Sequence, residues 1–136
     1  MMLVSVVIPA YNEEKYLGET LKRLSEQVHP DFDFEMIVAD AASTDKTAEI
    51  TKKYGARIVS VPKINPATAR QLAVEKAQGE IICCIDADTL VPKNHLSTVV
   101  EEFNRDPAVV GLTGTIEGSG ENKLVNFVYK WGNTLF

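Results

Sequence analysis

Short apolar runs alternate along this chain with segments that repeat apolar residues at helical spacing, and this alternation limits the fold to few architectures. The strand-like runs cover residues 3–8, 34–39, 57–61, 80–85 and 108–115. Strands this apolar are typical of sheets that are buried on both faces. We therefore predict an α/β fold, a mostly parallel sheet with helices on both faces and right-handed crossovers.

The predicted helices are marked by apolar stripes and by residues that begin or end a helix. The first has a stripe that runs from Leu17 to Val28, and Asn12 is its expected N-cap. Gly55 and Gly79 are expected to end the second and third helices. A fourth helix is predicted over residues 92–103.

A final helix is predicted within residues 121–136, and its apolar stripe has two interpretations. It could lie on a membrane surface, with Trp131, Lys123 and Lys130 at the interface. It could instead pack on the sheet, on a missing domain or on a second copy of the chain in a homodimer. Two lysines are few for an anionic lipid surface, which favours packing.

Composition points to one soluble globular domain that spans residues 1–136. Apolar residues make up 45% and charged residues 24% of the chain, and the net charge of −5 argues against a nucleic-acid backbone as partner. Cys83 and Cys84 are adjacent in an apolar run, which indicates buried thiols in a reducing, cytoplasmic setting. No apolar stretch reaches the ~20 residues that cross a bilayer, and no secretory leader is recognisable.

Polar residues collect where the predicted strands end. They comprise residues 9–13 after the first strand, 40–45 after the second and 86–89 after the fourth, together with Arg70 on the helix that leads into the fourth strand. In open α/β sheets, ligands bind beyond the carboxyl ends of the strands. We therefore expect a binding site at this edge.

Asp86 and Asp88 follow an uninterrupted apolar strand and are two positions apart. Carboxylates this close repel each other unless a cation lies between them. Oxygen ligands favour Mg²⁺ or Mn²⁺, which bind phosphate oxygens alongside one or two carboxylates. The pair could thus face a divalent cation that carries a diphosphate; the alternative is ordinary turn chemistry, with an Asp as a helix cap.

Asp40, Tyr11 and Glu13 each have a binding and a structural interpretation. Asp40 could accept hydrogen bonds from a base or from ribose hydroxyls, or it could cap its own loop. Tyr11 could stack on a planar base. Alternatively, Tyr11 and Glu13 serve as the entrance to the first helix, where the helix dipole favours an acidic residue.

The remaining candidates are basic. The Arg70 guanidinium suits a phosphate or a carboxylate, or it is a solvated surface charge. His29 and His95 lie near no carboxylate cluster in the sequence, and we expect both to be structural. No serine lies in a nucleophile elbow, and no glycine-rich phosphate loop is present.

Three stretches carry a family resemblance. Residues 4–27 (VSVVIPAYNEEKYLGETLKRLSEQ), 36–50 (MIVADAASTDKTAEI) and 67–92 (ATARQLAVEKAQGEIICCIDADTLVP) closely resemble, in order and spacing, the family 2 glycosyltransferases with the Rossmann-like GT-A fold. The match covers about residues 3–115. Members usually continue into an acceptor-binding half, so the chain resembles the N-terminal, donor-binding part, apparently truncated.

The resemblance implies a nucleotide-diphospho-sugar donor, such as a UDP-sugar or GDP-sugar, and an inverting transfer to a lipid-linked or polysaccharide acceptor. It also implies a peripheral location at the membrane for some members. By position in the family motifs, Pro9, Tyr11 and Glu13 would line the base and ribose pocket, and Asp40 would meet the base. Arg70 would lie near the nucleotide or its diphosphate. Asp86 would approach the ribose or the metal, and Asp88 would coordinate Mg²⁺ or Mn²⁺. The metal would neutralise charge on the departing nucleoside diphosphate.

The chain also departs from the family pattern. Ala41 and Ala42 stand where glycine is common, and Gln71 replaces an Asn. After residue 115 the only carboxylates are Glu117 and Glu121, and neither lies in a motif that resembles the family's general base. We therefore name no catalytic base. Two other classes stay open: a module that binds nucleotide sugar without transferring it, and a purely structural α/β domain.

Overall fold

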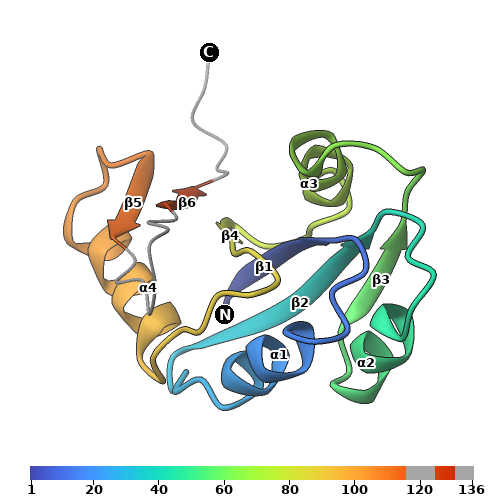
Figure 1. Ribbon diagram of the computed structural model, residues 1–136. Helices are drawn as coiled ribbons and strands as arrows, with labels where there is room; N and C mark the ends of the chain where they lie inside the picture. The colour runs from blue at the N-terminus through green and yellow to red at the C-terminus, as the bar shows by residue number, and fades with distance from the viewer. Residues whose placement is uncertain (116–124, 131–136) are drawn as a thin grey trace.

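The computed structural model describes residues 1–115 and 125–130 (Figure 1). Its elements are β1 (Met2–Ala10), α1 (Leu17–Ser25), β2 (Phe32–Asp40), α2 (Thr47–Lys53), β3 (Arg57–Ser60), α3 (Pro66–Val74), β4 (Ile81–Cys84), α4 (His95–Arg105), β5 (Gly111–Thr115) and β6 (Val125–Lys130). No helix in this part of the chain is long and apolar enough to cross a membrane.

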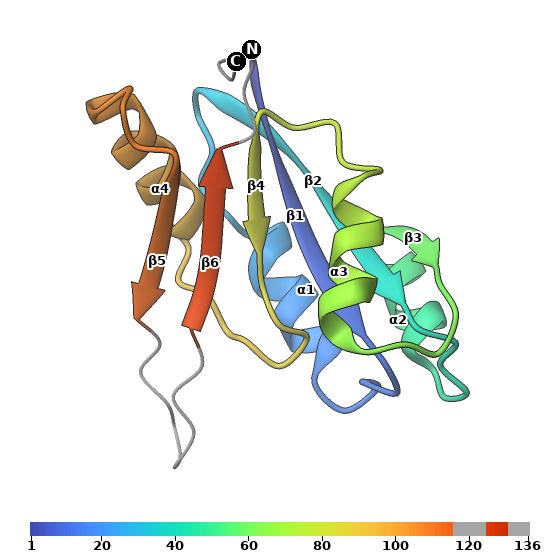
Figure 2. The same ribbon diagram turned by 90° about the horizontal axis from the view of Figure 1, so that it is seen from above.

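One sheet holds all the described strands, in the order β3-β2-β1-β4-β6-β5 (Figure 2). Strands β1 to β4 pair in parallel, with Ala10 opposite Asp40 and Val4 opposite Ile81. Strand β6 runs antiparallel to both β4 and β5. The predicted mostly parallel α/β sheet is confirmed, with one reversed strand near an edge.

Alternating side chains of β1 divide the core between two faces. Val6 and Ile8 are buried in a cluster with apolar residues of α1 and α4. Val7 points the other way and packs with α3 residues such as Ala69 and Ala73. Figure 1 shows α3 on the face opposite to α1 and α2, so helices cover both faces as predicted.

The first helix differs from its prediction at both ends. It begins at Leu17, with no side-chain cap, and ends at Ser25, which leaves Val28 54% exposed. Asn12 is therefore not its N-cap. Asn12 has φ +50, and its side chain accepts a hydrogen bond from the Thr44 N–H. Residues 12–14 bond to the segment after β2 before the helix begins.

The helix predicted over residues 121–136 is wrong for residues 125–130, which form β6. Val125, Phe127 and Tyr129 alternate with other residues there, and β-branched and aromatic residues favour strands. The sequence of this short segment is compatible with helical and with strand periodicity. Pairing with β4 on one side and β5 on the other favours the strand. The rest of that prediction, including Lys123, Trp131, Glu117 and Glu121, lies outside the described residues.

Gly79 does not end α3, which stops at Val74. It instead lies where the chain enters β4 against β1. A Cβ on Gly79 would come 2.6 Å from the Ser5 nitrogen and 2.8 Å from the Leu3 oxygen. The Ser5 hydroxyl accepts a hydrogen bond from the Gly79 N–H at 2.8 Å and donates one to Glu35 at 2.6 Å. This contact fixes the end of the sheet opposite to the candidate site.

Candidate functional site

Three loops meet where β1, β2 and β4 end. Parallel register aligns these ends: Ala10 pairs with Asp40, and the Ile85 N–H donates to the Val7 carbonyl. The Ala41 N–H continues the ladder by bonding to the Ala10 carbonyl at 2.9 Å. The structure therefore brings residues 9–13, 40–45 and 86–89 to one edge of the sheet, where the sequence places a binding site.

A cavity of about 240 Å³ opens beside the first two loops. It is lined by Pro9, Ala10, Tyr11, Glu13, Ala41, Ile64, Pro66 and Ala69. Pockets that enclose a whole drug-sized ligand have roughly 300–1,000 Å³. This cavity therefore fits one part of a larger ligand, and its apolar lining suits a planar group.

Tyr11 lies at the opening of this cavity with 41% of its surface exposed. The Lys63 ammonium lies 4.9 Å from the centre of the Tyr11 ring, a cation–π distance. The ring therefore already has a cation beside it and still presents surface to solvent.

The loops after β1 and β2 are joined by reciprocal hydrogen bonds. The Asn12 N–H donates to the Ser43 hydroxyl at 2.9 Å, and the Thr44 N–H donates to the Asn12 amide oxygen at 2.8 Å. The Glu13 N–H donates to the Thr47 hydroxyl at 2.9 Å. Tyr11 and Glu13, on either side of Asn12, are thus held by contacts with the neighbouring loop.

Asp40 is 8% exposed, and its Oδ1 accepts a hydrogen bond from the Ser43 N–H at 3.1 Å. The loop-capping interpretation is thus part of what Asp40 does. Ala42, inside the same loop, has φ +59. This is the left-handed conformation that glycine adopts at least cost, so the loop keeps a glycine-like backbone without the glycine.

Burial alternates along the turn after β4. Ala87 and Thr89 are 3% and 5% exposed, whereas Asp86 is half-buried and Asp88 is exposed. Both carboxylates of this turn therefore project away from the core. The Thr89 N–H donates to the Asp86 carbonyl at 3.1 Å, and the Thr20 hydroxyl of α1 donates to the Ala87 carbonyl at 2.7 Å.

Arg70 crosses from α3 to this turn. Its Nη2 lies 3.0 Å from Asp86 Oδ1, and both side chains are about one-third exposed at 30% and 31%. The Arg70 Nε is buried and has no hydrogen-bond partner among the described residues. Arg70 therefore holds Asp86 while it keeps further donor capacity at the site.

The pKa of the Glu13 side chain is raised above its ordinary value by its surroundings. Partial burial is the main cause, and repulsion from Asp88, Asp45 and Asp86 adds to it. Negative charge is thus concentrated at this edge, which favours a cation. Arg70 neutralises part of it at Asp86 but leaves Asp88 exposed.

The donor set fits a divalent cation that arrives with its own ligand. Among residues 1–115 and 125–130, no group of three or more His, Cys, Asp or Glu side chains is arranged as a metal cage. Mg²⁺ and Mn²⁺ bind through one or two carboxylates, several waters and substrate phosphates. Asp88, with Asp86 beside it, is such a donor set.

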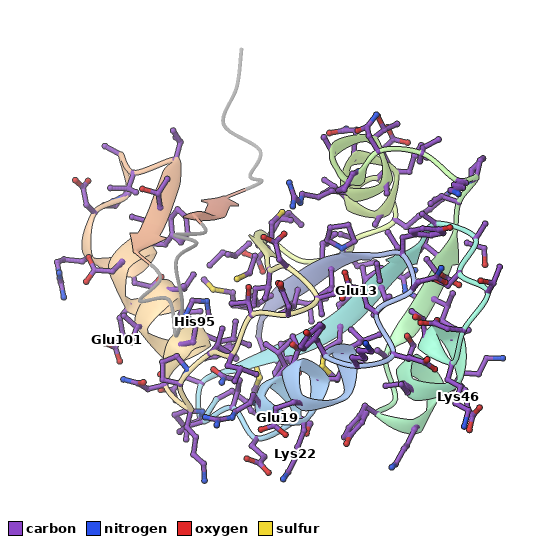
Figure 3. All side chains as sticks on the ribbon, viewed as in Figure 1. Glu13, Glu19, Lys22, Lys46, His95 and Glu101 are labelled. Carbon is purple, nitrogen blue, oxygen red and sulfur yellow. The ribbon has the colours of Figure 1, made fainter. Side chains whose placement is uncertain are left out.

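His95 lies apart from these loops, at the start of α4 (Figure 3). Its Nε2 is 3.7 Å from Cys83 Sγ, and burial lowers the pKa of the imidazole. His29 has its Nδ1 3.1 Å from the Phe32 carbonyl. Both histidines contact structural elements, as expected.

Sequence reasoning missed the side chains that support the site. Asn12 was expected to cap a helix, and Thr20 lies unremarked within the apolar stripe of α1. A threonine among buried leucines is a usable signal, because a buried hydroxyl needs a partner. Which partner it finds, 67 positions away, requires the fold.

A family model described as "Glycosyl transferase family 2" matches residues 5–133. The chain belongs to this family. The match extends over all three loops of the candidate site, and it confirms the resemblance carried by the three sequence stretches. Similarity to solved structures places the mostly parallel sheet within the GT-A fold.

Two curated relatives of this family 2 chain come from bacteria. The poly(ribitol-phosphate) beta-N-acetylglucosaminyltransferase TarS of Staphylococcus aureus is 34% identical over 129 residues, which cover 88% of this chain and 22% of TarS. The teichuronic acid biosynthesis glycosyltransferase TuaG of Bacillus subtilis is 34% identical over 118 residues, which cover 82% of this chain and 46% of TuaG. The chain therefore spans less than half the length of these relatives.

Solved structures of glycosyltransferases are also similar to this chain. Staphylococcus aureus TarS 1–349 in complex with UDP-GlcNAc aligns with a TM-score of 0.75 and 28% identity, over 89% of this chain and 37% of that one. The mannosyltransferase PcManGT from Pyrobaculum calidifontis, in complex with GDP-Man and Mn²⁺, aligns with a TM-score of 0.70 and 31% identity, over 79% and 34%.

Proposed function

We propose that this chain is the donor-binding part of a glycosyltransferase. It binds a nucleotide-diphospho-sugar through Mg²⁺ or Mn²⁺ and transfers the sugar, with inversion, to an acceptor. The observation that supports this most is the meeting of Asp40, Arg70, Asp86 and Asp88 at one sheet edge beside an apolar cavity. Family membership adds the reaction class.

Each residue has a role in this proposal. The base enters the cavity formed by Pro9 and Tyr11 and stacks on the tyrosine ring, while Asp40 and Glu13 accept hydrogen bonds from the base or ribose. Arg70 donates to a diphosphate oxygen, since a guanidinium suits phosphate. Asp86 meets the ribose or joins Asp88 as a metal ligand. A bound divalent cation would neutralise charge on the leaving nucleoside diphosphate.

The choice of donor and acceptor draws on the relatives. UDP-GlcNAc in the TarS structure and GDP-Man with Mn²⁺ in the PcManGT structure make UDP-sugars and GDP-sugars the first candidates. The acceptor class we propose is a polysaccharide or a lipid-linked saccharide. TuaG is named for teichuronic acid, a polysaccharide, and TarS for poly(ribitol-phosphate), a polymer of a sugar alcohol phosphate. Cys83 and Cys84 are buried cysteines that form no disulfide, which suits a reaction in the cytoplasm, with peripheral contact to the membrane where the acceptor is lipid-linked.

Calorimetric titration and thermal-shift measurements test the donor site. UDP, GDP and their sugar conjugates are added with and without Mn²⁺, to the wild type, to Asp88→Asn and to Glu101→Gln. Glu101 is an exposed carboxylate on α4, away from the site (Figure 3). We expect Mn²⁺ to strengthen nucleotide binding in the wild type and in Glu101→Gln, and to have no such effect in Asp88→Asn. No binding by any nucleotide would contradict the proposal.

The second candidate is a module that binds nucleotide sugar but transfers nothing. The matched stretch spans 22% of TarS and 46% of TuaG, so donor binding and sugar transfer have to be tested separately. Incubation with a radiolabelled sugar donor and Mn²⁺ separates the two. Release of labelled sugar, to an added acceptor or to water, supports an enzyme. Tight binding without release supports the module.

A further inference from the structure

Thr20 is a fully buried hydroxyl on the apolar face of α1. Leu17, Leu21 and Leu24 share that buried face, and Thr20 itself is 0% exposed. Burying a hydroxyl without a hydrogen bond is unfavourable. A Val or Leu would complete the same stripe without that requirement, so the hydroxyl's partner is the feature to explain.

The partner lies in the turn after β4. Thr20 Oγ1 is 2.7 Å from the Ala87 carbonyl oxygen and 3.4 Å from the Tyr16 carbonyl oxygen of its own helix. A helical threonine ordinarily bonds the carbonyl four residues earlier. Here the single hydroxyl proton has its shorter contact with a carbonyl 67 positions away.

Ala87 is the residue between the two carboxylates. Its carbonyl belongs to the peptide group that links Ala87 to Asp88, and a peptide group is planar. A hydrogen bond that fixes this carbonyl therefore fixes the plane from which Asp88 departs. Figure 1 shows the chain between β4 and α4 passing α1, which is the element that supplies the contact.

Other contacts constrain the same turn from its two sides. The Thr89 N–H donates to the Asp86 carbonyl at 3.1 Å, and Arg70 holds the Asp86 carboxylate at 3.0 Å. Asp88 itself is exposed. Thr20 is thus the contact from the core that constrains the peptide on which Asp88 is carried.

We propose that Thr20 is a positioning residue, which orients Asp88 toward a divalent cation bound with the nucleotide diphosphate. The proposal rests on the proposed donor-binding function. It differs from a merely structural role in one consequence. Loss of the hydroxyl should weaken the contribution of the metal to nucleotide affinity, and not only the stability of the fold.

The test compares three variants. Thr20→Val keeps the shape and removes the hydroxyl, whereas Thr20→Ser keeps the hydroxyl. Thr51→Val is the matched control, because Thr51 is also a fully buried helical threonine but donates to the Thr47 carbonyl of its own helix at 2.9 Å. The dissociation constant of UDP or GDP, whichever the wild type binds, is measured by calorimetry with Mn²⁺ and with EDTA. Unfolding of each variant is followed in parallel by thermal shift.

For Thr20→Val we expect affinity with Mn²⁺ to fall about tenfold, since a buried carbonyl loses its partner and the carboxylate loses its fixed orientation. Affinity in EDTA should stay unchanged. Thr20→Ser should behave as wild type, and Thr51→Val should lose stability but keep the effect of Mn²⁺. If Thr20→Val does not fold, Thr20→Ala removes the same hydroxyl without a methyl group against the carbonyl.

Each outcome decides the matter. An unchanged effect of Mn²⁺ in Thr20→Val, with binding intact, overturns the role of Thr20 and leaves the proposed function standing. A similar loss in Thr51→Val overturns it too, because general destabilisation then explains the effect. Absence of nucleotide binding by the wild type overturns the proposed function itself, and the positioning role with it.

Discussion

The Arg70 guanidinium on α3 donates to the Asp86 carboxylate after β4 across 3.0 Å. This pair joins the helix on one face of the sheet to the turn that carries both carboxylates. Both side chains are about one-third exposed, so solvent screens the pair and it contributes at most about 1 kcal/mol to stability. Its main consequence is geometric: Asp86 is turned toward Arg70, and Asp88 is left exposed.

Replacing Arg70 by Met should therefore weaken nucleotide binding more than it weakens the fold. The guanidinium offers several donors to a diphosphate, and Nε is buried without a partner among the described residues. We expect the dissociation constant for the nucleotide to rise about tenfold in calorimetry, the loss of one charge-assisted hydrogen bond. Arg57→Met is the control, because Arg57 pairs with Glu35 at 3.1 Å near the opposite end of the sheet. Equal losses of affinity in both variants would contradict the prediction.

Gly79→Ala should destabilise the protein without changing the residues of the candidate site. The added Cβ would meet backbone atoms of β1 at 2.6 Å and 2.8 Å, which cannot move away as a flexible side chain can. Overpacking of this kind costs about 1–3 kcal/mol, measurable as a lower urea midpoint. Gly18→Ala is the paired variant: its Cβ would have only ordinary contacts, 3.7 Å from Ile50, inside a helix. It should be neutral or stabilising, and equal destabilisation of the two would contradict this reading.

Ala42→Gly should stabilise the protein. Ala42 has φ +59, and the left-handed conformation costs a non-glycine residue roughly 1–2 kcal/mol, part of which glycine loses again in chain entropy. We expect a net gain of about 1 kcal/mol and a rise of roughly 3–6 °C in the melting temperature. Ala48→Gly, in α2, should shift it the other way because glycine disfavours helix. A lower melting temperature for Ala42→Gly would show that the loop relaxes in a different way.

Sequence periodicity was sufficient for the sheet and its layers. The runs that end at Asp40 and Asp86 are apolar enough to be buried on both faces, and strand ends in a parallel sheet must converge. Convergence of Asp40, Arg70 and Asp86 at one edge therefore followed from the alternation of strands and helices. The cavity beside Tyr11 followed less directly, because Ile64 and Pro66 come from a loop with no periodicity.

Local patterns failed where a distant segment supplies the partner. Asn12 has the chemistry of a helix cap, but the Thr44 N–H is available to it and the helix begins five residues later. Residues 125–130 have a helical stripe and a strand alternation at once, and pairing with β4 and β5 decides for the strand. The buried stripe of α1 indicates that the Thr20 hydroxyl needs a partner, but only the fold shows that the partner is the Ala87 carbonyl.

Glu13 should make stability depend on pH. Burial raises its pKa, and so do the neighbouring carboxylates, Asp88 first among them. The folded state thus binds the Glu13 proton more tightly than the unfolded chain, in which the Glu13 pKa is near its ordinary value of 4.5. Below that value the residue is protonated in both states and contributes no difference; as pH rises above it, ionisation disfavours the folded state.

Glu13→Gln removes this ionisation. The free energy of unfolding of this variant should be similar to that of the wild type below pH 4.5 and higher than that of the wild type at neutral pH. Urea denaturation at a series of pH values between these limits measures the difference. Glu19→Gln, which removes an exposed carboxylate on α1 that pairs with Arg23, is the control for the loss of a negative charge. A difference between wild type and Glu13→Gln that stays constant with pH would argue against a raised pKa.

Asn12→Gly should loosen the junction between the first two loops. Glycine keeps the backbone at φ +50 but removes the oxygen that accepts from the Thr44 N–H at 2.8 Å. We expect stability to fall by about 1 kcal/mol, the Thr44 amide to exchange faster with solvent, and nucleotide affinity to fall because Tyr11 and Glu13 lose their fixed spacing.

Asn12→Asp separates the hydrogen bond from the conformation. Aspartate tolerates positive φ and keeps an acceptor for the Thr44 N–H, so protection of that amide should return. It also adds a negative charge beside Asp45 and Glu14, so nucleotide affinity without metal should recover less than amide protection does. If Asn12→Gly leaves Thr44 exchange and nucleotide affinity unchanged, the junction does not depend on this side chain. The bonds from the Asn12 and Glu13 N–H groups to the Ser43 and Thr47 hydroxyls then hold the loops.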